Sequence, residues 1–338
     1  MKQFPDSPHA PAETRDWPPI SVVMPVLNEE RHLREAVDMV LAQSYPGEIE
    51  IVLAVGPSRD RTQEVAEAIA AADPRVTVVP NPSGRTPSAL NAAIAASRNG
   101  IIARVDGHAM LPSDYLRVAV ETLAETGADN VGGIMAAEGV TAFEQAVARA
   151  MTSKIGVGAA AFHVGGTAGP AETVYLGVFR RKALERVGGY DEHFQRAQDW
   201  EMNHRIRQTG GLVWFQPRMR VSYRPRPNVK ALAKQYFHYG RWRRVVWRTH
   251  EGTMSPRYLA PPAAVLAIVL GLVAAPFFPL ALILPGGYVA AIVAGSVLTG
   301  GGLPITVMLR LPIVYATMHV CWGWGFITSP RKLARPLS

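Results

Sequence analysis

Cysteine is almost absent from this chain, with Cys321 the single one among 338 residues. Disulfide bonds therefore play no part in the fold that we expect. Long apolar runs are also missing before Ile20, and the polar, proline-rich stretch 1–19 predicts a disordered leader and no signal peptide. Without such a signal, the soluble part is expected to remain on the cytoplasmic side.

Charged residues are missing from the long stretch 258–309. This length is sufficient for two membrane crossings of about 20 residues each. A third apolar stretch lies at 311–328, so the region 258–328 is expected to hold two or three membrane segments. Several prolines and the Gly300-Gly301-Gly302 run predict that these segments are broken or re-entrant.

Acidic residues are scarce where basic ones are dense. Lys and Arg number 35 against 27 Asp and Glu, a formal charge of +8, and eleven of the basic residues lie between Arg218 and Arg257 beside one acid, Glu251. A basic, aromatic stretch at 236–244 would suit nucleic-acid binding. Its place directly before the charge-free region instead favours anionic lipid headgroups. We therefore predict a basic interfacial segment at 229–257, with membrane lipids and not nucleic acid as partners.

The charges after the last apolar stretch bear on the topology. Three crossings would leave the basic tail 329–338 outside, against the positive-inside rule. Two crossings and an interfacial third segment would keep it inside, and the sequence leaves both arrangements open. In either one we expect a multi-pass protein of the cytoplasmic (inner) membrane whose soluble domain is cytoplasmic.

Strand-like and helix-like segments alternate from Ile20 onward. Compact β-branched or apolar runs predict strands, and apolar residues at helical spacing predict helices. The strands are expected at 20–26, 49–55, 76–79, 101–105, 130–133, 174–179 and 213–215. The helices are expected after Asn28 and at 62–72, 87–97, 115–125, 141–150, 182–187 and 199–208. This alternation predicts an α/β fold with a mostly parallel sheet.

One segment of the soluble part has no clear period. Residues 153–173 are rich in glycine and alanine, which predicts a mobile loop at the active site.

Polar side chains follow several of the predicted strands. Pro25-Val26-Leu27-Asn28-Glu29, Ser58-Arg59-Asp60 and Asp106-Gly107-His108 come directly after the first, second and fourth strands. Because the carboxyl ends of parallel strands share one edge of a sheet, where nucleotides bind, these side chains should lie close together. A carboxylate and an imidazole are suitable ligands for Mn²⁺ or Mg²⁺ holding a diphosphate, although a solvated Asp-Gly turn would look the same in sequence.

These motifs, together with Asp199-Trp200-Glu201 and the apolar C-terminal region, resemble family 2 glycosyltransferases, whose fold is called GT-A. The resemblance covers roughly 20–242 and suggests a GT-A domain at 20–228. It is strongest to membrane-attached members that build exopolysaccharide repeats on a polyprenyl lipid, including the succinoglycan glucosyltransferase type.

The resemblance implies a set of donor-binding residues. Those expected at the nucleotide-diphosphate sugar are Pro25, Val26, Asn28, Glu29, Ser58, Asp60, Arg85, Asn91, Asp106 and Arg241. The chain departs from the family at Val55, where many relatives have an aspartate that accepts from uracil. Structural alternatives stay open: Asn28 and Asp60 could each cap the following helix, Arg85 could be solvated, and Asn91 could belong to a helix face.

The same resemblance assigns the metal and the base. Asp106 and His108 occupy the place of the Asp-x-Asp motif, which implies Mn²⁺ or Mg²⁺ as cofactor. Asp199 corresponds to the second residue of the Glu-Asp pair and would take the acceptor proton in an inverting displacement, unless it is only a helix cap. Glu201 is expected to face away from the site and to pair with Arg205 at i, i+4.

Three residues are expected on the acceptor and diphosphate side, namely Gln198, Trp200 and Trp242. Gln235 with Arg241-Trp242 resembles the Gln-x-x-Arg-Trp motif of processive relatives, but the spacing here is wider. An amphipathic helix at the membrane surface explains Arg241 and Trp242 equally well.

The expected function is an inverting, metal-dependent glycosyltransferase. It would transfer a hexose, from UDP-glucose or a similar donor, to a lipid-linked saccharide or polyprenyl phosphate in cell-surface polysaccharide synthesis. One alternative is a nucleotidyltransferase, although the turn 25–29 lacks the glycine-rich basic loop that such an enzyme would use. The other alternative is a non-catalytic membrane scaffold with a degenerate nucleotide fold.

Overall fold

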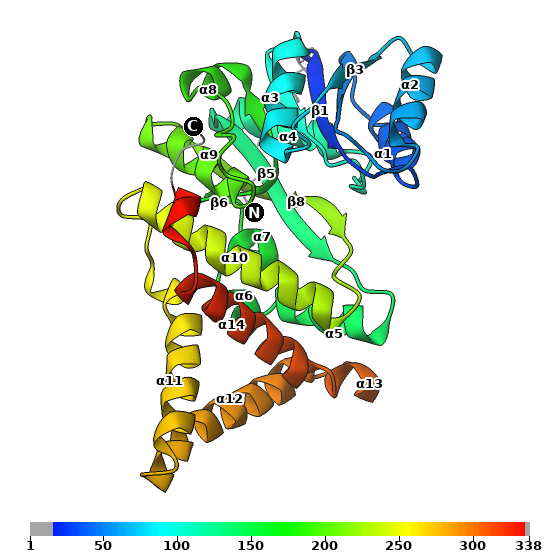
Figure 1. Cartoon of the computed structure of the whole chain (residues 1–338). Helices are drawn as coiled ribbons and strands as arrows, with labels where there is room; N and C mark the ends of the chain where they lie inside the picture. The colour runs from blue at the N-terminus through cyan, green and yellow to red at the C-terminus, as the bar shows by residue number, and fades with distance from the viewer. Residues whose placement is uncertain (1–15, 335–338) are drawn as a thin grey trace, which may run out of the picture.

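The computed structural model describes residues 16–334, in which an α/β domain sits above a triangle of apolar helices (Figure 1). The strands of the domain are β1 Ile20–Val26, β2 Ile49–Val55, β3 Val76–Pro80, β4 Ile101–Arg104, β5 Asn130–Ala137, β6 Gly169–Pro170, β7 Tyr175–Arg180 and β8 Val213–Tyr223. Its helices are α1 Leu33–Leu41, α2 Thr62–Ala72, α3 Thr86–Ala96, α4 Tyr115–Thr126, α5 Ala142–Met151, α6 Lys154–Val157, α7 Ala161–Val164, α8 Arg181–Arg186 and α9 Gln198–Gln208.

All eight strands form one sheet in the order β3-β2-β1-β4-β7-β5-β8-β6. Strands β1 to β4 pair in parallel, as do β5 and β8, whereas β7 and β6 are antiparallel to their neighbours. The sheet is therefore mostly parallel, as the alternating pattern predicts. The carboxyl ends of β1, β2, β3 and β4 lie along one edge, where the candidate site is found.

Helices cover both faces of the sheet, and successive side chains of a strand point to opposite faces, so each strand contributes to two cores. In β1, Val22 and Met24 pack in the core that α1, α2 and α4 cover. Val23 of the same strand packs in the other core with Leu90 of α3 and Met202 of α9. Continuous apolar strands thus hold helices on both faces, and α9 is one of the helices fixed in this way.

Several predicted boundaries differ from the structure. The expected loop 153–173 contains α6, α7 and β6, because Ser153 caps a short turn and β6 pairs with β8. Strand β8 runs to Tyr223, well beyond the predicted 215. Within the expected leader, residues 1–15 lie outside the described residues, but Trp17 packs edge-on against Tyr45, so the expected disorder does not extend over residues 16–19.

The remaining elements form the apolar part. They are α10 Val229–Thr249, η1 Pro256–Tyr258, α11 Ala260–Ala274, η2 Pro279–Leu282, α12 Ile283–Gly300, α13 Ile305–Met308, α14 Leu311–Ile327 and η3 Arg331–Ala334. Among residues 16–334, three stretches are long and apolar enough to cross a membrane, 256–274, 279–300 and 305–327, and they indicate association with a membrane. In Figure 1, α11 runs away from the α/β domain, α12 returns, and α14 closes the triangle beside α10.

Candidate functional site

The loops after β1 and β2 are joined by hydrogen bonds at the edge of the sheet. The Asn28 backbone N–H donates to Ser58 Oγ over 3.0 Å, and the Asn28 side-chain oxygen accepts from the Arg59 backbone N–H over 2.8 Å. Asn28 has φ 57°, a left-handed conformation that asparagine tolerates better than most residues. Two of the predicted donor-side motifs are therefore in direct contact.

Asn28 does not cap the first helix, so that alternative is wrong. Helix α1 begins at Leu33 with His32 as its N-cap residue. The Asn28 side chain is instead directed across to the second loop. Asp60 does act at the start of α2, since its Oδ1 accepts from the Thr62 backbone over 3.2 Å, and its Oδ2 accepts from the Glu30 backbone over 3.3 Å. These bonds lower the pKa of Asp60, the side-chain bond from Thr62 having the largest effect.

The loop after β4 meets the loop after β1. His108 Nδ1 lies 2.7 Å from Glu29 Oε1. This hydrogen bond raises the pKa of His108 above its usual value. Gly107 lies against Glu29, since a Cβ at this position would be 3.2 Å from the Glu29 Cγ. The three polar motifs predicted to share a rim are thus brought together, with Asp106, His108 and Glu29 adjoining.

The donor atoms at this rim fit a divalent cation that is shared with a substrate. Within residues 16–334, no group of three or more His, Cys, Asp or Glu side chains forms a metal cage. Such a cage is not required, because Mg²⁺ in phosphate-binding sites is commonly held by one or two carboxylates, with substrate phosphates and water completing the shell. Asp106 and His108 supply one carboxylate and one imidazole on a single turn, a combination that suits Mn²⁺.

A buried arginine links the two candidate carboxylates. Arg104, with 5% of its side chain exposed, donates to Asp106 Oδ1 from Nε over 3.1 Å and from Nη2 over 3.0 Å. Its Nη1 donates to Asp199 Oδ1. Arg104 and Asp106 share one side of the chain because strand side chains alternate. Sequence reasoning missed this residue, although an arginine inside the apolar run 101–105 was a signal for it.

Asp199 lies in the first turn of α9, opposite Asp106 across Arg104. About a third of its side chain, 31%, is exposed. Burial of the carboxyl raises the pKa of Asp199, and the Arg104 guanidinium works in the opposite direction. A carboxylate whose pKa is raised in this way is a stronger base than a fully solvated aspartate, so this group is chemically suited to accept a proton.

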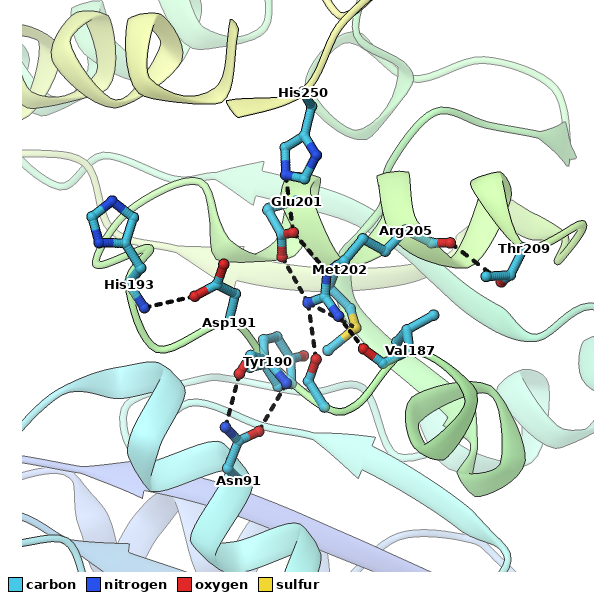
Figure 2. A network of polar contacts seen from close by, with 11 residues as sticks. Asn91, Val187, Tyr190, Asp191, His193, Glu201, Met202, Arg205, Thr209 and His250 are labelled. Carbon is cyan, nitrogen blue, oxygen red and sulfur yellow. Dashed lines mark hydrogen bonds and ion pairs between the residues drawn. The ribbon is translucent and has the colours of Figure 1, made fainter. Parts of the chain in front are cut away.

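Helix α9 is held by a buried ion-pair network (Figure 2). Glu201, with 1% of its side chain exposed, pairs with Arg205 over 2.6 Å and accepts from His250 Nε2 over 3.1 Å. Although burial alone would raise the pKa of Glu201, the hydrogen bonds from His250 and Arg205 lower it overall. The predicted pair of Glu201 with Arg205 is confirmed, whereas His250, just after α10, is a partner that sequence reasoning missed.

Asn91 is bonded to the chain that precedes α9. Its amide donates to the Tyr190 carbonyl and accepts from the Tyr190 backbone N–H, both over 2.8 Å (Figure 2). Arg205 completes the support by donating to the Gly189 carbonyl over 2.9 Å. The structure therefore gives Asn91 a positioning function between α3 and the 187–194 segment, and its contact with the donor stays a prediction.

Two of the predicted acceptor-side residues, Trp200 and Trp242, lie between α9 and α10. The Trp200 ring stacks on His204 with centroids 5.1 Å apart, and the Arg243 guanidinium lies 4.2 Å from the Trp200 ring centroid. Trp242 is only 6% exposed and packs beside His193 and Phe194, so its ring faces protein here. Stacking of Trp242 on a sugar stays a prediction.

The remaining residues predicted for the site lie at several places around the sheet edge and on α10. The Arg241 guanidinium lies 4.3 Å from the Phe237 ring centroid on α10. Arg85 precedes α3 in an 81–85 loop whose backbone is fixed by Asn81 and Ser83. Val55 is buried at the end of β2, so no carboxylate occupies the position that reads uracil in many relatives. Pro25 and Val26 end β1, and Gln198 begins α9.

Comparison with known proteins bears on the whole arrangement. Residues 21–188 match the family model described as glycosyl transferase family 2. The chain is 32% identical over 307 residues to the succinoglycan biosynthesis protein ExoA of Rhizobium meliloti (strain 1021), covering 90% of this chain and 93% of that protein. It is 26% identical over 232 residues to a dolichyl N-acetyl-alpha-D-glucosaminyl phosphate 3-beta-D-2,3-diacetamido-2,3-dideoxy-beta-D-glucuronosyltransferase of Methanococcus voltae, covering 65% and 71%.

The fold also matches a solved structure. The mannosyltransferase PcManGT from Pyrobaculum calidifontis, in complex with GDP-Man and Mn²⁺, superposes with a TM-score of 0.59 at 20% identity, covering 94% of this chain and 90% of that one. This likeness extends over the α/β domain and beyond it, and it confirms the predicted GT-A type of fold.

Proposed function

Because this chain belongs to glycosyl transferase family 2, we propose that it transfers a hexose from a nucleotide-diphosphate sugar to a lipid-linked acceptor in cell-surface polysaccharide synthesis. UDP-glucose or a close relative is the donor that we favour. The acceptor is a lipid-linked saccharide or polyprenyl phosphate. The similarity to a succinoglycan biosynthesis protein and to an enzyme acting on a dolichyl-linked sugar supports this assignment.

One observation carries the proposal: Arg104 is bonded to both Asp106 and Asp199. The two carboxylates therefore lie on either side of one buried guanidinium group. A donor whose diphosphate meets Asp106 would present its anomeric carbon towards Asp199. Asp199 would then take the proton from the acceptor hydroxyl as that oxygen attacks, which gives inversion of configuration.

On the donor side, the joined loops after β1, β2 and β4 would hold the nucleotide. The residues assigned to this role are Pro25, Val26, Asn28, Glu29, Ser58, Asp60, Arg85, Asn91, Asp106 and Arg241. Asp106 and His108 would hold Mn²⁺ or Mg²⁺, as the donor set and the Mn²⁺ in the mannosyltransferase of this fold suggest. A bound divalent cation would neutralise charge on the departing diphosphate.

On the acceptor side, Gln198, Trp200 and Trp242 would line the approach to Asp199. We propose that the domain 20–228 works at the cytoplasmic face of the inner membrane. The basic segment 229–257 would contact anionic headgroups, and 258–328 would be the membrane region. An acceptor confined to a bilayer is met more often by an enzyme that is anchored in the same bilayer.

The decisive experiment uses full-length protein in native membranes, a panel of radiolabelled nucleotide sugars and a membrane lipid extract. We expect label to enter the lipid fraction only with Mn²⁺ or Mg²⁺ present, with release of a nucleoside diphosphate. Asp199→Asn and Asp106→Ala should abolish transfer, whereas Asp38→Asn, an exposed aspartate on α1, should not. Unchanged turnover in both site variants would contradict the assignment, and release of pyrophosphate would favour a nucleotidyltransferase.

A further inference from the structure

Helices α11 and α12 form a hairpin that projects away from the α/β domain (Figure 1). In each of these stretches only 17% of the most apolar window is buried. Large apolar side chains are exposed all along both helices, including Leu270, Val273, Val289 and Val297. A surface of this kind requires an apolar surrounding, and the stretch 258–309 contains no charged residue to interrupt it.

The tip of the hairpin is as apolar as its arms. It consists of Ala275-Pro276-Phe277-Phe278-Pro279-Leu280-Ala281-Leu282, with no polar side chain. Phe277 is 89% exposed, and Phe278 and Leu280 are also exposed. If the hairpin crossed a bilayer completely, this tip would have to lie in water on the far side. Its composition instead suits the hydrocarbon interior.

Both ends of the hairpin are tied to the α/β domain. Before α11, Arg257 pairs with Glu172 over 2.7 Å. After α12, Arg149 of α5 donates to the Thr299 carbonyl over 2.5 Å and to the Gly301 carbonyl over 3.3 Å. The hairpin therefore enters and leaves on one side. Helix α11 alone has 15 residues and spans about 22 Å at 1.5 Å per residue, and it reaches the length of a crossing only within the 19-residue stretch 256–274 that includes η1.

Helix α14 is buried against protein to a greater extent than α11 and α12, since 33% of its most apolar window is buried, against 17% in each of the other two. Val314, Tyr315 and Met318 pack in one core with Val147 and Met151 of α5. The Tyr315 hydroxyl lies 2.9 Å from Ser153 Oγ, and His319 Nε2 donates to the Ile155 carbonyl over 2.8 Å. These contacts fix the middle of α14 to the α/β domain.

The opposite face of α14 carries an apolar stripe. Its exposed large side chains are Ile313, Val320, Trp324 and Ile327, which recur at helical spacing. A crossing helix remote from other segments would be exposed around its circumference, whereas an interfacial helix buries one face and presents the other to lipid. The pattern of α14 is that of an interfacial helix.

The chain after α14 returns to the same domain. His193 Nε2 donates to the Leu333 carbonyl over 2.5 Å. Ser329 Oγ donates to the Arg241 carbonyl, and Arg248 donates to the Ser329 carbonyl, both over 3.0 Å. An odd number of crossings would place Leu333 and His193 on opposite sides of the bilayer, which this contact does not allow.

We propose that the protein is monotopic. The α11–α12 hairpin enters the bilayer from the side of the α/β domain and turns within the hydrocarbon, while α14 lies at the interface and does not cross. The partner of this surface is the lipid bilayer itself. Arg257 and Arg310 flank the charge-free stretch, and each stands where it would meet headgroups on that one side. This topology replaces the multi-pass arrangement expected from sequence, and it is independent of which sugar is transferred.

Thiol accessibility tests the proposal in full-length protein in native membranes. Cys321→Ser provides a cysteine-free background, into which Phe277→Cys, Leu280→Cys, Lys332→Cys and Lys182→Cys are introduced singly. The probe is a membrane-impermeant maleimide, applied to sealed vesicles of either orientation. Lys182 is an exposed residue of α8 and reports the side of the α/β domain.

We expect the thiols at 332 and 182 to react from the same side and those at 277 and 280 to react from neither side until detergent is added. Reaction at 277 or 280 from the side opposite to 182 would establish a transmembrane hairpin and overturn the proposal. Reaction there from the same side as 182 would show that the hairpin is not inserted, which overturns it as well. Reaction of the thiols at 332 and 182 from opposite sides of the membrane would establish an odd number of crossings and overturn the proposal.

A second measurement does not depend on labelling. Phe277→Asp would place a charge in hydrocarbon if the hairpin turns inside the bilayer, but in water if it crosses. We expect most of this variant to be lost from the membrane fraction, with Val140→Asp, at an exposed apolar residue of the α/β domain, as the matched control. Equal membrane fractions for the two variants would contradict a tip within the hydrocarbon.

Discussion

The two sides of the candidate site are built by different means. On the donor side, loops that directly follow β1, β2 and β4 are joined by hydrogen bonds of polar side chains, such as those of Asn28 with Ser58 and Arg59 and of His108 with Glu29. On the acceptor side, α9 is fixed by the buried Glu201 with Arg205 and His250, and by stacked rings. The first side is assembled by the sheet itself, whereas the second depends on side chains from α10 and the segment between α10 and α11.

This difference predicts on which side a substitution should have the larger effect on stability and activity. Exposed ion pairs of the donor rim, such as Glu30 with Arg61, are screened by water and contribute little. On the acceptor side, removing one partner of a buried ion pair lowers the stability strongly, because little water reaches the remaining charge to solvate it. We therefore expect the acceptor side to be the more sensitive to single changes and the donor side to be sensitive mainly in nucleotide binding.

Arg104→Met should have the largest effect, since Arg104 is the residue that both sides share. Removing it leaves Asp106 and Asp199 without their common cation. Loss of one partner from a buried pair costs about 3–5 kcal/mol, and kcat should fall together with stability. Thermal unfolding and initial rates measure the two effects, and Arg104→Lys should recover part of both. A change confined to the donor KM would break the comparison, because Arg104 would then belong to the donor side alone.

Glu201→Ala should destabilise the protein by about 3 kcal/mol, because it leaves Arg205 without its carboxylate in a buried site. We expect kcat to fall while the donor KM stays unchanged, since α9 carries Asp199 but no donor loop. Thermal unfolding and donor saturation curves provide the measurement. Glu30→Ala, on the donor rim, is the control and should leave the unfolding temperature unchanged.

Asn91→Ala tests a contact between the two sides, because Asn91 lies on α3 of the donor side and binds the segment that precedes α9. Its amide makes two hydrogen bonds to the Tyr190 backbone, and leaving such groups unpaired costs about 1–3 kcal/mol. We expect a lower unfolding temperature from the lost bonds to Tyr190 and, because Asn91 is also assigned to the donor, a raised donor KM. A lower unfolding temperature with an unchanged donor KM would leave Asn91 with its positioning function alone and would remove it from the nucleotide site.

Acidification should produce the smallest effect, through the buried Glu201 of the acceptor side. The pKa of Glu201 is lowered in the folded protein, so its stabilising contribution is complete above the ordinary value of 4.5 and is lost as pH falls through the lower folded value. The stability difference between wild type and Glu201→Gln should therefore shrink below about pH 4.5. Chemical denaturation at several pH values measures this difference, and a gap that stays constant to low pH would argue against a charged Glu201.

Much of the donor side could be predicted from the sequence. Parallel strands end at one edge, so the turns after 26, 55 and 104 had to meet, and Asp106 with His108 was found on that rim. The contact of Arg104 with Asp199 spans 95 positions in the chain, and that of Glu201 with His250 spans 49. No local pattern specifies such pairs, which is why Arg104 and His250 were missed.

The sequence by itself determined the α/β class, the rim motifs, the charge-free region and its basic border. These follow from periodicity, strand polarity and the cost of placing charge in hydrocarbon, all of which act locally along the chain. Only the tertiary structure decided that Arg104 lies between the two carboxylates and that α14 binds α5 and α10 with its buried face. The hydropathy of a residue is a property of that residue alone, whereas its burial depends on which distant segment packs against it. Packing against the α/β domain therefore distinguishes α14 from the two helices of the hairpin, although all three are apolar.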